Sequence, residues 1–293
     1  MKFLLVGAGR RNQLVKLIKQ KNIAVHSYEL DKNCPIKLIA DEIIQGKSWN
    51  DKSIFFDLMQ LSKNYDLVIP LMDKAVEIVS ELNINNSSTS SFETSSLCLR
   101  KDLFEKYFCN DEELKYIYPV PDSKSVVLKP ILGQGSKGIY YKNSNPGNVD
   151  GYIVQKKITG KEYSVDCFYD VNSNLVDFVP RERIRVSSGE VMESITVNKS
   201  KFESIINLIS KKINFKGPIC MQFIEDNNGK IWIMEINARL GGGSTLSISS
   251  GLDLIQLLIE SFCLKTFDIT RYQSTWKENY KFIRYTLDYC YEA

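Results

Sequence analysis

Histidine is nearly absent from this sequence, and long apolar runs are missing. His26 is the only histidine among 293 residues, which excludes a metal site built from several histidines and disfavours histidine acid–base chemistry. No apolar run reaches the roughly 20 residues that a membrane-spanning helix needs. The opening segment MKFLLVGAGRR has too short an apolar stretch for a secretory signal peptide. We therefore expect a cytoplasmic protein with no membrane partner.

The sequence also lacks a strong net charge and closely paired cysteines. Its 38 basic and 35 acidic residues leave a formal net charge of +3, which is too small to favour nucleic-acid binding. The seven cysteines are scattered and form no CxxC pair. An odd number of isolated cysteines indicates buried free thiols in a reducing compartment, rather than disulfides or a metal site.

The first third of the chain alternates short apolar runs with helical patterns. Strands are predicted at 2–6, 23–28, 43–44 and 66–70, and helices after Gly9 and at 53–61. This alternation favours an α/β fold with a parallel, doubly wound sheet. Residues 83–94 are rich in Asn, Ser and Thr, which indicates a domain boundary. We place the first domain at residues 1–86.

In the rest of the chain, strands outnumber helices. Helices are predicted at 96–108, 201–213 and 252–262, and strands at 125–129, 139–142, 152–156, 219–225 and 230–237. Several strand-like segments follow one another between residues 162 and 197, which favours an antiparallel sheet. The Asn228-Gly229 pair between the last two strands is a strong hairpin signal. We therefore expect an α+β fold for this part.

The predicted C-terminal hairpin carries oxygen-bearing side chains on one face. Glu235 and Asn237 are two residues apart on one strand, and the hairpin brings Gln222 beside them. Magnesium binds such oxygen ligands and completes its shell with water and phosphate oxygens. Arg239 shares this face and is suited to holding a phosphoryl oxygen. We interpret Gln222, Glu235 and Asn237 as metal ligands; a solvated strand face is the alternative.

A glycine-rich loop, GQGSKG, separates two predicted strands at residues 133–138. Glycines let backbone N–H groups approach phosphate oxygens, and a hydroxyl adds a donor. The residues that we assign to phosphate binding are Gly133, Gly135, Ser136 and Gly138. Lys129, which ends the preceding strand, and Lys101, which begins a helix, are candidate cations for the same phosphates. No helix follows the loop, so it is not a Walker A loop, and a flexible turn is the alternative.

The segment after residue 152 has features of a site for a nucleotide base and its ribose. Gln155, Lys156, Lys157 and Ile158 form an extended run whose backbone can pair with an adenine edge. Glu162 opens the next strand, where a carboxylate is suited to holding ribose hydroxyls. A charged connecting loop explains the local pattern equally well.

Alternating arginines occur in the predicted strand PRERIRV. Arg181, Arg183 and Arg185 are two residues apart and share one face. A guanidinium group binds a carboxylate through two parallel hydrogen bonds, so Arg181 and Arg183 are candidates for holding a substrate carboxylate. A solvated basic stripe is the alternative.

Together these motifs resemble the ATP-grasp superfamily, and most closely the short relatives of the carbamoyl-phosphate synthase large subunit. The resemblance runs from the N-terminus to about Gly251. It implies nucleotide-binding lysines at 101 and 129, a mobile phosphate-covering loop at 133–138 and an adenine-binding hinge at 155–158. A glutamine at 222 is what the carbamoyl-phosphate synthase branch carries.

The same resemblance implies roles for the remaining motifs. Glu162 matches the ribose-binding glutamate, and Arg239 matches the phosphate-binding arginine. The segments MQF, around Gln222, and MEINAR, around Glu235, match the paired metal-ligand strands. The implied cofactors are therefore ATP and Mg²⁺, or Mn²⁺ in its place.

The resemblance also implies an architecture. Residues 1–86 would form a Rossmann-like domain that precedes the ATP-grasp domain at 87–293. Within the latter, a lid would occupy about 117–156 and the C-terminal catalytic sheet about 157–293. Nucleotide would bind between the lid and that sheet.

The function that follows is a carboxylate–amine ligase that forms an acyl phosphate, then an amide, and releases ADP and phosphate. Its partners would be a small-molecule carboxylate and an amine, and a homodimer is left open. The chain is far shorter than a full carbamoyl-phosphate synthase and contains no recognisable glutaminase domain, so carbamoyl phosphate synthesis is disfavoured.

Three alternatives remain open at this point. An ATP-grasp kinase would release a stable phosphorylated product without an amine. A nucleotide-binding module would bind ATP without turnover. A nicotinamide-dependent oxidoreductase would use Gly7-Ala8-Gly9 with Glu29 and Asp31, although Asn12 stands where a dinucleotide motif has its third glycine.

Overall fold

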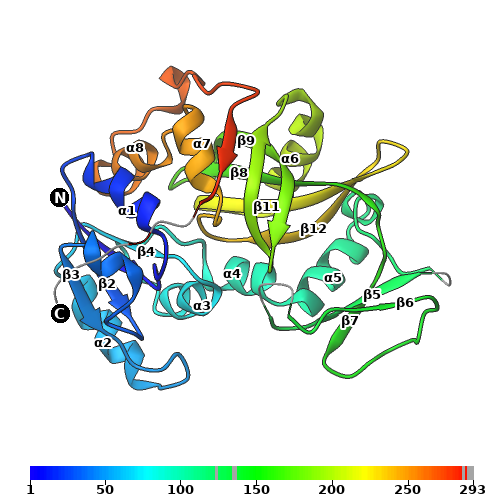
Figure 1. Ribbon diagram of the computed structural model, residues 1–293, viewed down its shortest axis with the longest axis horizontal. Coiled ribbons are helices and arrows are strands. Elements are labelled where there is room, and N and C mark those ends of the chain that lie inside the picture. Colours follow the sequence, from blue (N-terminus) through cyan, green and yellow to red (C-terminus); the bar gives the residue numbers. More distant parts are fainter. Residues whose placement is uncertain (123–124, 134–136, 286–287, 289–293) are drawn as a thin grey trace.

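The computed structural model describes residues 1–122, 125–133, 137–285 and 288, and within them the strands form three sheets (Figure 1). A parallel sheet built from the N-terminal segment lies at one end of the molecule. A small antiparallel sheet lies at the opposite end, and a large antiparallel sheet lies between them. The combination of an α/β part and an α+β part is therefore confirmed.

The N-terminal sheet has the order β3-β2-β1-β4, and its neighbouring strands run parallel. Its strands are β1 (Lys2–Val6), β2 (Ala24–Glu29), β3 (Glu42–Gln45) and β4 (Leu67–Pro70). The helices of this part are α1 (Asn12–Lys19), the 3-10 helix η1 (Pro35–Leu38), α2 (Ser53–Ser62) and α3 (Asp73–Glu81). Helices pack on both faces, so β1 is apolar on both sides. The predicted doubly wound parallel sheet is confirmed.

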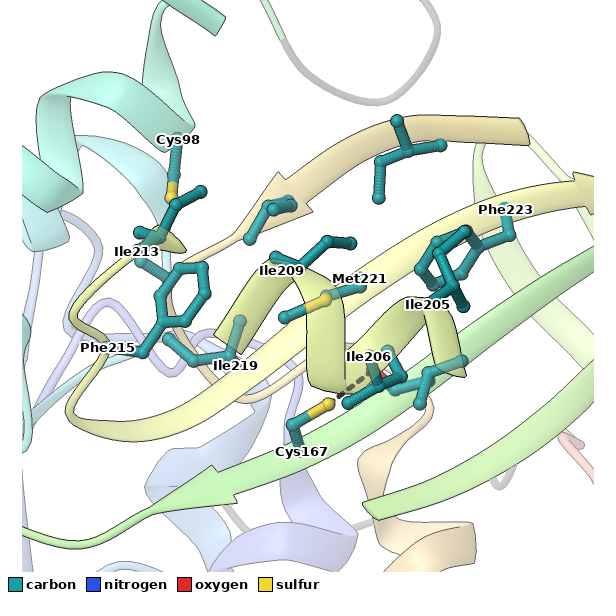
Figure 2. Close-up of a cluster of buried hydrophobic side chains, with 14 of the residues drawn as sticks. Cys98, Cys167, Ile205, Ile206, Ile209, Ile213, Phe215, Ile219, Met221 and Phe223 are labelled. Carbon is teal, nitrogen blue, oxygen red and sulfur yellow. Dashed lines mark hydrogen bonds between the residues drawn. The ribbon is translucent and has the colours of Figure 1, made fainter. Parts of the chain in front are cut away.

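The large sheet has the order β12-β11-β8-β9-β10-β13, with antiparallel neighbours. Its strands are β8 (Gly160–Tyr169), β9 (Leu175–Ser187), β10 (Glu190–Thr196), β11 (Gly217–Asp226), β12 (Ile231–Asn237) and β13 (Lys281–Ile283). The amphipathic helix α6 (Ser200–Lys212) covers one face, where Ile206 and Ile209 lie against Cys167 and Met221 (Figure 2). Residues that alternate with these, such as Gln222, face the other side.

The small sheet has the order β6-β5-β7 and contains β5 (Val126–Pro130), β6 (Tyr140–Lys142) and β7 (Tyr152–Lys156). Two helices, α4 (Phe92–Leu99) and α5 (Lys101–Asn110), and the 3-10 helix η2 (Leu114–Tyr116) precede it. The prediction of one helix at 96–108 was wrong, because Arg100 has extended backbone angles, φ −96 and ψ 111. This break places Lys101 at the first turn of α5.

The Ser/Thr-rich stretch that we interpreted as a boundary is buried in its central part. Ser87, Ser88, Thr89 and Ser90 are each at most 8% exposed. The backbone of Val68 pairs with this stretch on one side, and Ser90 accepts a hydrogen bond from Lys216 N on the other. The segment therefore joins the N-terminal sheet to the large sheet as a packed connection.

The C-terminal part contains α7 (Ser244–Ser250), α8 (Leu254–Leu258), the π-helical turn η3 (Ile259–Leu264) and the 3-10 helix η4 (Ile269–Arg271). No single helix of the described residues has the length and hydropathy of a membrane span; α7 with the segment Leu254–Leu264 reaches them only across a 98° bend. Six cysteines in this part of the chain are free thiols, and Cys290 lies outside it.

Candidate active site

A cleft of about 690 Å³ lies where the three sheets meet. Residues of β5 and β7, of the large sheet, and of the loop after β4 line it. Nearly every residue that we proposed from the motifs contributes to this lining, including Lys101, Lys129, Gln155, Glu235 and Arg239. Segments that are far apart in the sequence therefore meet at one concave site of the size that a nucleotide requires.

The three proposed metal ligands lie together on the cleft face of β11 and β12. Gln222 is directly opposite Glu235 in the antiparallel register. The Nε2 atom of Gln222 donates to Glu235 Oε1 over 2.5 Å, and Asn237 Nδ2 donates to the same oxygen over 3.1 Å. The carboxylate of Glu235 thus accepts a hydrogen bond from each of the two side-chain amides.

A bulge in β12 sets which side chains reach the cleft. Glu235 pairs with Gln222, but Ile233 pairs with Phe223, so Met234 is the extra residue of the bulged strand. Ile233 is buried in the core, whereas Met234, Glu235 and Asn237 line the cleft. Without the bulge, Ile233 and Glu235 would share a face, because side chains alternate along a strand.

The side chains of Gln222, Glu235 and Asn237 offer the type and the small number of oxygen ligands that a magnesium ion takes from protein. Gln222 Oε1 and Asn237 Oδ1 accept from Arg183 Nη1 and Arg239 Nη2 at 3.1 and 3.2 Å. Glu235 Oε2 has no donor among the described residues. The described part of the chain contains no cluster of three or more His, Cys, Asp and Glu side chains. Any metal here would have one carboxylate and two amides as ligands, a sparse set of the kind that Mg²⁺ accepts beside phosphate oxygens.

Two lysines lie on the side of the cleft formed by the small sheet. Burial lowers the pKa of Lys129 to about 8, Lys101 acts in the same direction, and the carboxylates of Glu235 and Glu162 partly oppose it. Lys101 Nζ donates to Gly133 O over 3.1 Å. Both lysines therefore sit beside the glycine-rich loop, where they would meet phosphate oxygens.

The glycine-rich loop is described only at its ends. Gly133 lines the cleft, and Gly138 has a positive φ of +71, which favours glycine at that position. The expected phosphate-binding residues Gly135 and Ser136 lie outside the described residues.

The proposed adenine hinge ends β7 and enters the cleft. Gln155 is fully buried, and its Nε2 donates to Tyr118 Oη over 2.7 Å, whereas its Oε1 has no partner. Tyr118 Oη itself donates to Glu105, so it can only accept from Gln155, which fixes the orientation of the amide. Lys157 and Ile158 line the cleft, and Lys156 pairs with Asp122 outside its lining.

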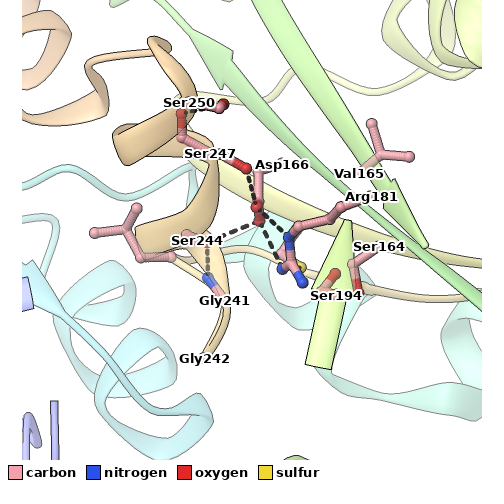
Figure 3. A network of polar contacts seen from close by, with 12 residues as sticks. Ser164, Val165, Asp166, Arg181, Ser194, Gly241, Gly242, Ser244, Ser247 and Ser250 are labelled. Carbon is pink, nitrogen blue, oxygen red and sulfur yellow. Dashed lines mark hydrogen bonds and ion pairs between the residues drawn. The ribbon is translucent and has the colours of Figure 1, made fainter. Parts of the chain in front are cut away.

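The arginines of β9 differ in their surroundings. Arg181 is 1% exposed, and its Nε and Nη2 bind both oxygens of Asp166, which also accepts from Ser244 and Ser247 of α7 (Figure 3). The two-pronged contact that we expected Arg181 to offer a substrate carboxylate is thus made to a protein carboxylate. Burial opposes ionisation of Asp166, but Arg181 and the hydroxyls outweigh it and lower its pKa.

Arg183 is the arginine of β9 that remains directed at the cleft. Its Nη1 holds Gln222 and its Nη2 donates to Gly189 O over 3.2 Å. Its buried Nε makes no hydrogen bond and lies 3.4 Å from Glu162, the proposed ribose ligand. Arg183 therefore connects the proposed ribose and metal positions.

Comparison with known proteins identifies this arrangement. Residues 148–281 match the family described as "ATP-grasp in the biosynthetic pathway with Ter operon". The structure resembles N5-carboxyaminoimidazole synthetase from Staphylococcus aureus complexed with ADP, with a TM-score of 0.72 over 89% of this chain and 77% of that chain at 17% identity. The likeness to this solved structure shows the fold of the chain. The expected ATP-grasp fold is confirmed.

Two further relatives extend this ATP-grasp comparison. L-amino acid ligase from Bacillus licheniformis gives a TM-score of 0.69 over 94% of this chain and 77% of that chain, at 14% identity. Phosphoribosylamine–glycine ligase from Methanosphaera stadtmanae is 26% identical over 86% of this chain and 70% of its own length. These matches agree with the ATP-grasp fold, and none of the three relatives named is a carbamoyl-phosphate synthase.

The cleft also contains two residues that sequence reasoning missed, Asp73 and Arg11. Arg239 Nε binds Asp73 Oδ1 over 2.7 Å, so the first turn of α3 reaches the metal-ligand strand. Arg11, in the loop before α1, donates to three carbonyl groups in the cleft wall. Neither Asp73 nor Arg11 belongs to a local motif of the sequence. Asp73 binds Arg239, which is 166 positions away, and the partners of Arg11 lie in two other segments of the chain.

The glycine segment Gly7-Ala8-Gly9 is closed by an internal carboxylate. Glu29 Oε1 accepts from Ala8 N over 2.6 Å and from Gly9 N over 3.1 Å, and Glu29 is 5% exposed. A dinucleotide turn presents such N–H groups to a pyrophosphate. Here they are already occupied, which argues against the oxidoreductase alternative.

Proposed function

We propose that this ATP-grasp protein is an ATP- and Mg²⁺-dependent carboxylate–amine ligase. The observation that carries the proposal is the meeting of Gln222, Glu235 and Asn237 on one sheet face, inside the cleft that also contains Lys129. Oxygen ligands opposite buried cations form a site for a metal-bound triphosphate. The names of the two ligases among the relatives agree with this activity.

The nucleotide would lie between the small sheet and the large sheet. Gln155 Oε1 is buried without a partner and, with its amide orientation fixed, offers an acceptor for the exocyclic amine of adenine. Ile158 would contact the base, and Glu162 would hold the ribose. Buried unpaired acceptors are costly, which supports a ligand at this point.

Phosphoryl transfer in this proposal needs no protein nucleophile. A carboxylate oxygen of the acid attacks the γ-phosphorus, the bond from phosphorus to the β–γ bridging oxygen breaks, and ADP leaves with that electron pair. Lys101, Lys129 and Arg239 hold the phosphate oxygens and stabilise the charge that develops there. Magnesium, when bound by Gln222, Glu235 and Asn237, supplies further neutralisation of phosphate charge.

Amide formation follows from the acyl phosphate. The amine nitrogen attacks the acyl carbon, the bond from that carbon to the phosphate oxygen breaks, phosphate leaves, and the nitrogen loses a proton. Arg183 would stabilise the leaving phosphate, since it lies beside the metal ligands and its buried Nε makes no hydrogen bond. Covering of the site by the 133–138 loop would exclude water from the intermediate.

The test is ADP release screened over acids and amines with MgATP, followed by mass spectrometry of the products. Hydroxylamine serves as a trap, because it converts an acyl phosphate into a hydroxamate. ADP release that needs both an acid and an amine supports the ligase. A stable phosphorylated product formed without an amine would instead assign the kinase alternative.

The variant Glu235→Gln tests the metal-ligand assignment. It retains the shape of the side chain but removes the one carboxylate of the group, so we expect turnover to fall by about 100-fold or more while nucleotide binding survives in part. Glu203→Gln is the matched control, because Glu203 is exposed on α6, on the opposite face of the sheet. Equal turnover in the two variants would contradict the assignment.

A further inference from the structure

Arg11 holds the N-terminal sheet against the large sheet from inside the cleft wall. Its Nη1 donates to Leu240 O and Gly241 O, each over 3.0 Å, and its Nη2 donates to Leu71 O over 2.8 Å. The first two carbonyls follow β12, and the third follows β4. The guanidinium group is therefore fixed in position beside the end of the metal-ligand strand.

The partners of Arg11 are all neutral, in contrast to those of the arginines around it. Each neighbouring arginine has a carboxylate partner; the pairs are Arg181 with Asp166, Arg239 with Asp73, and Arg284 with Glu190. Arg11 takes part in no ion pair with a described residue. Burial lowers its pKa to about 10, repulsion by Arg239 adds to this effect, and attraction by Glu190, which is itself paired with Arg284, opposes it only in part. A shielded cation without a counter-ion is costly unless an anion from outside completes the site.

Two of the N–H groups of Arg11 remain available. Nη1 donates to two carbonyl groups and Nη2 to one, whereas Nε has no acceptor among the described residues. Nε and Nη2 lie on one edge of the guanidinium group, the edge that binds an oxyanion through parallel hydrogen bonds, and each nitrogen has an N–H group to offer there. Arg11 lines the same cleft as Asp73, Arg239 and the 241–243 glycines.

The backbone N–H groups of the glycine segment before Arg11 are not available to bind an oxyanion. Glu29 already accepts the N–H groups of Ala8 and Gly9, and Gly7 N donates to Tyr28 O. The side chain of Arg11 is thus the donor that the glycine segment presents to the cleft.

We propose that Arg11 binds an oxyanion of the acid substrate and holds it next to the phosphoryl-transfer site. The inference rests on the proposed ligase function and assigns the binding of the acid to one residue of the cleft wall. A substrate carboxylate and the phosphate product share this chemistry, so the test has to separate them.

The experiment uses the full chain saturated with MgADP, and titrates it with acetate, with malonate and with inorganic phosphate. Binding is followed by calorimetry and by the shift in the unfolding temperature. Arg11→Gln removes the charge, and Arg11→Lys keeps the charge but loses the two-pronged geometry. Arg10→Gln is the matched control, since Arg10 is the exposed neighbour with no described contact.

We expect the wild type and Arg10→Gln to bind a carboxylate saturably. Arg11→Gln should weaken this binding by about tenfold or more, and Arg11→Lys should fall between them, with MgADP affinity within about threefold of the wild type in each variant. Stronger dependence on Arg11 for phosphate than for carboxylates would overturn the assignment to the acid substrate.

Two other results would also overturn the inference. One is that the wild type binds no carboxylate. The other is that Arg11→Gln loses MgADP affinity and carboxylate affinity equally, which would show that Arg11 only stabilises the contact between the two sheets. Failure of the wild type to bind MgADP or MgATP is a separate outcome, since it contradicts the proposed ligase itself.

Discussion

Lys129 shows how one residue of the site depends on both the small and the large sheet. It lies near the end of β5 of the small sheet, while the carboxylate of Glu235, which most favours its charged form, belongs to the large sheet. Burial nevertheless dominates and lowers its pKa to about 8. The charge that we assign to phosphate binding is therefore complete below this pH and titrates within the range of ordinary assays.

The affinity for MgATP should fall as the pH rises above about 8. Phosphate oxygens bind the protonated lysine, so each proton lost from free Lys129 must be regained on binding, and the affinity decreases by up to about tenfold per pH unit. Calorimetric titration between pH 6.5 and 9.5 measures this. Lys129→Arg keeps its charge over the whole range and should give a flat profile. A wild-type profile that is also flat would show that Lys129 does not contact the phosphates.

At the scale of the element, the start of β11 is defined by a close backbone approach. Gly217 has a φ of +72, and a Cβ atom there would lie 2.4 Å from Ser88 O. That oxygen belongs to the buried connection after the N-terminal sheet. The strand that carries Gln222 is thus positioned at its first residue by the segment that joins the two parts of the chain.

Gly217→Ala should lower the free energy of unfolding by about 3 kcal/mol, because a positive φ and a clash with backbone act together. Urea denaturation measures this loss. Gly229→Ala is the control: its φ of +80 is similar, but no atom lies within 4 Å of the added Cβ. It should cost only about 1 kcal/mol. Equal losses would mean that Ser88 moves away at no cost.

At the scale of the whole molecule, the N-terminal sheet and the C-terminal helices share one hydrophobic core. Phe3, Leu5 and Val15 belong to the same buried cluster as Ile255 and Leu258 of α8. This cluster also includes side chains of the large sheet, so residues 1–86 do not bury their apolar surface alone. In Figure 1 α7 and α8 lie between the N-terminal part and the large sheet.

We therefore expect the chain to unfold in one cooperative step, although proteins of this length often do not. Trp49 packs in the N-terminal part, and Trp232 lies on β12. In variants that keep only one of the three tryptophans, either Trp49 or Trp232, the fluorescence midpoint in urea should coincide with the circular-dichroism midpoint of the same variant. A Trp49 transition at lower urea than the backbone transition would mean that the N-terminal part unfolds independently.

The elements were predictable where a single periodicity covers the whole segment. Strand β7 begins and ends where we predicted, and α6 differs from its prediction by one residue at each end. In both elements the apolar side chains recur with a single period because they pack against one neighbouring layer. The prediction of one helix at 96–108 was wrong, because apolar residues occur on both sides of Arg100 and the break there leaves no signal in the pattern. Arg181 was placed on the correct strand, but its partner Asp166 lies on another strand, and strand pairing is not encoded in local sequence.

The sequence by itself determined the kinds of chemical group available, their order, and which motifs they form. Alternation within β12 brought Glu235 and Asn237 to one face, and the hairpin turn brought Gln222 opposite them. Tertiary structure alone decided the rest. The bulge at Met234 moved Ile233 into the core, Asp166 occupied the guanidinium group of Arg181, and Arg11 reached the cleft from a remote loop. The physical reason is that burial and charge pairing depend on which distant segments meet, and no local pattern specifies that meeting.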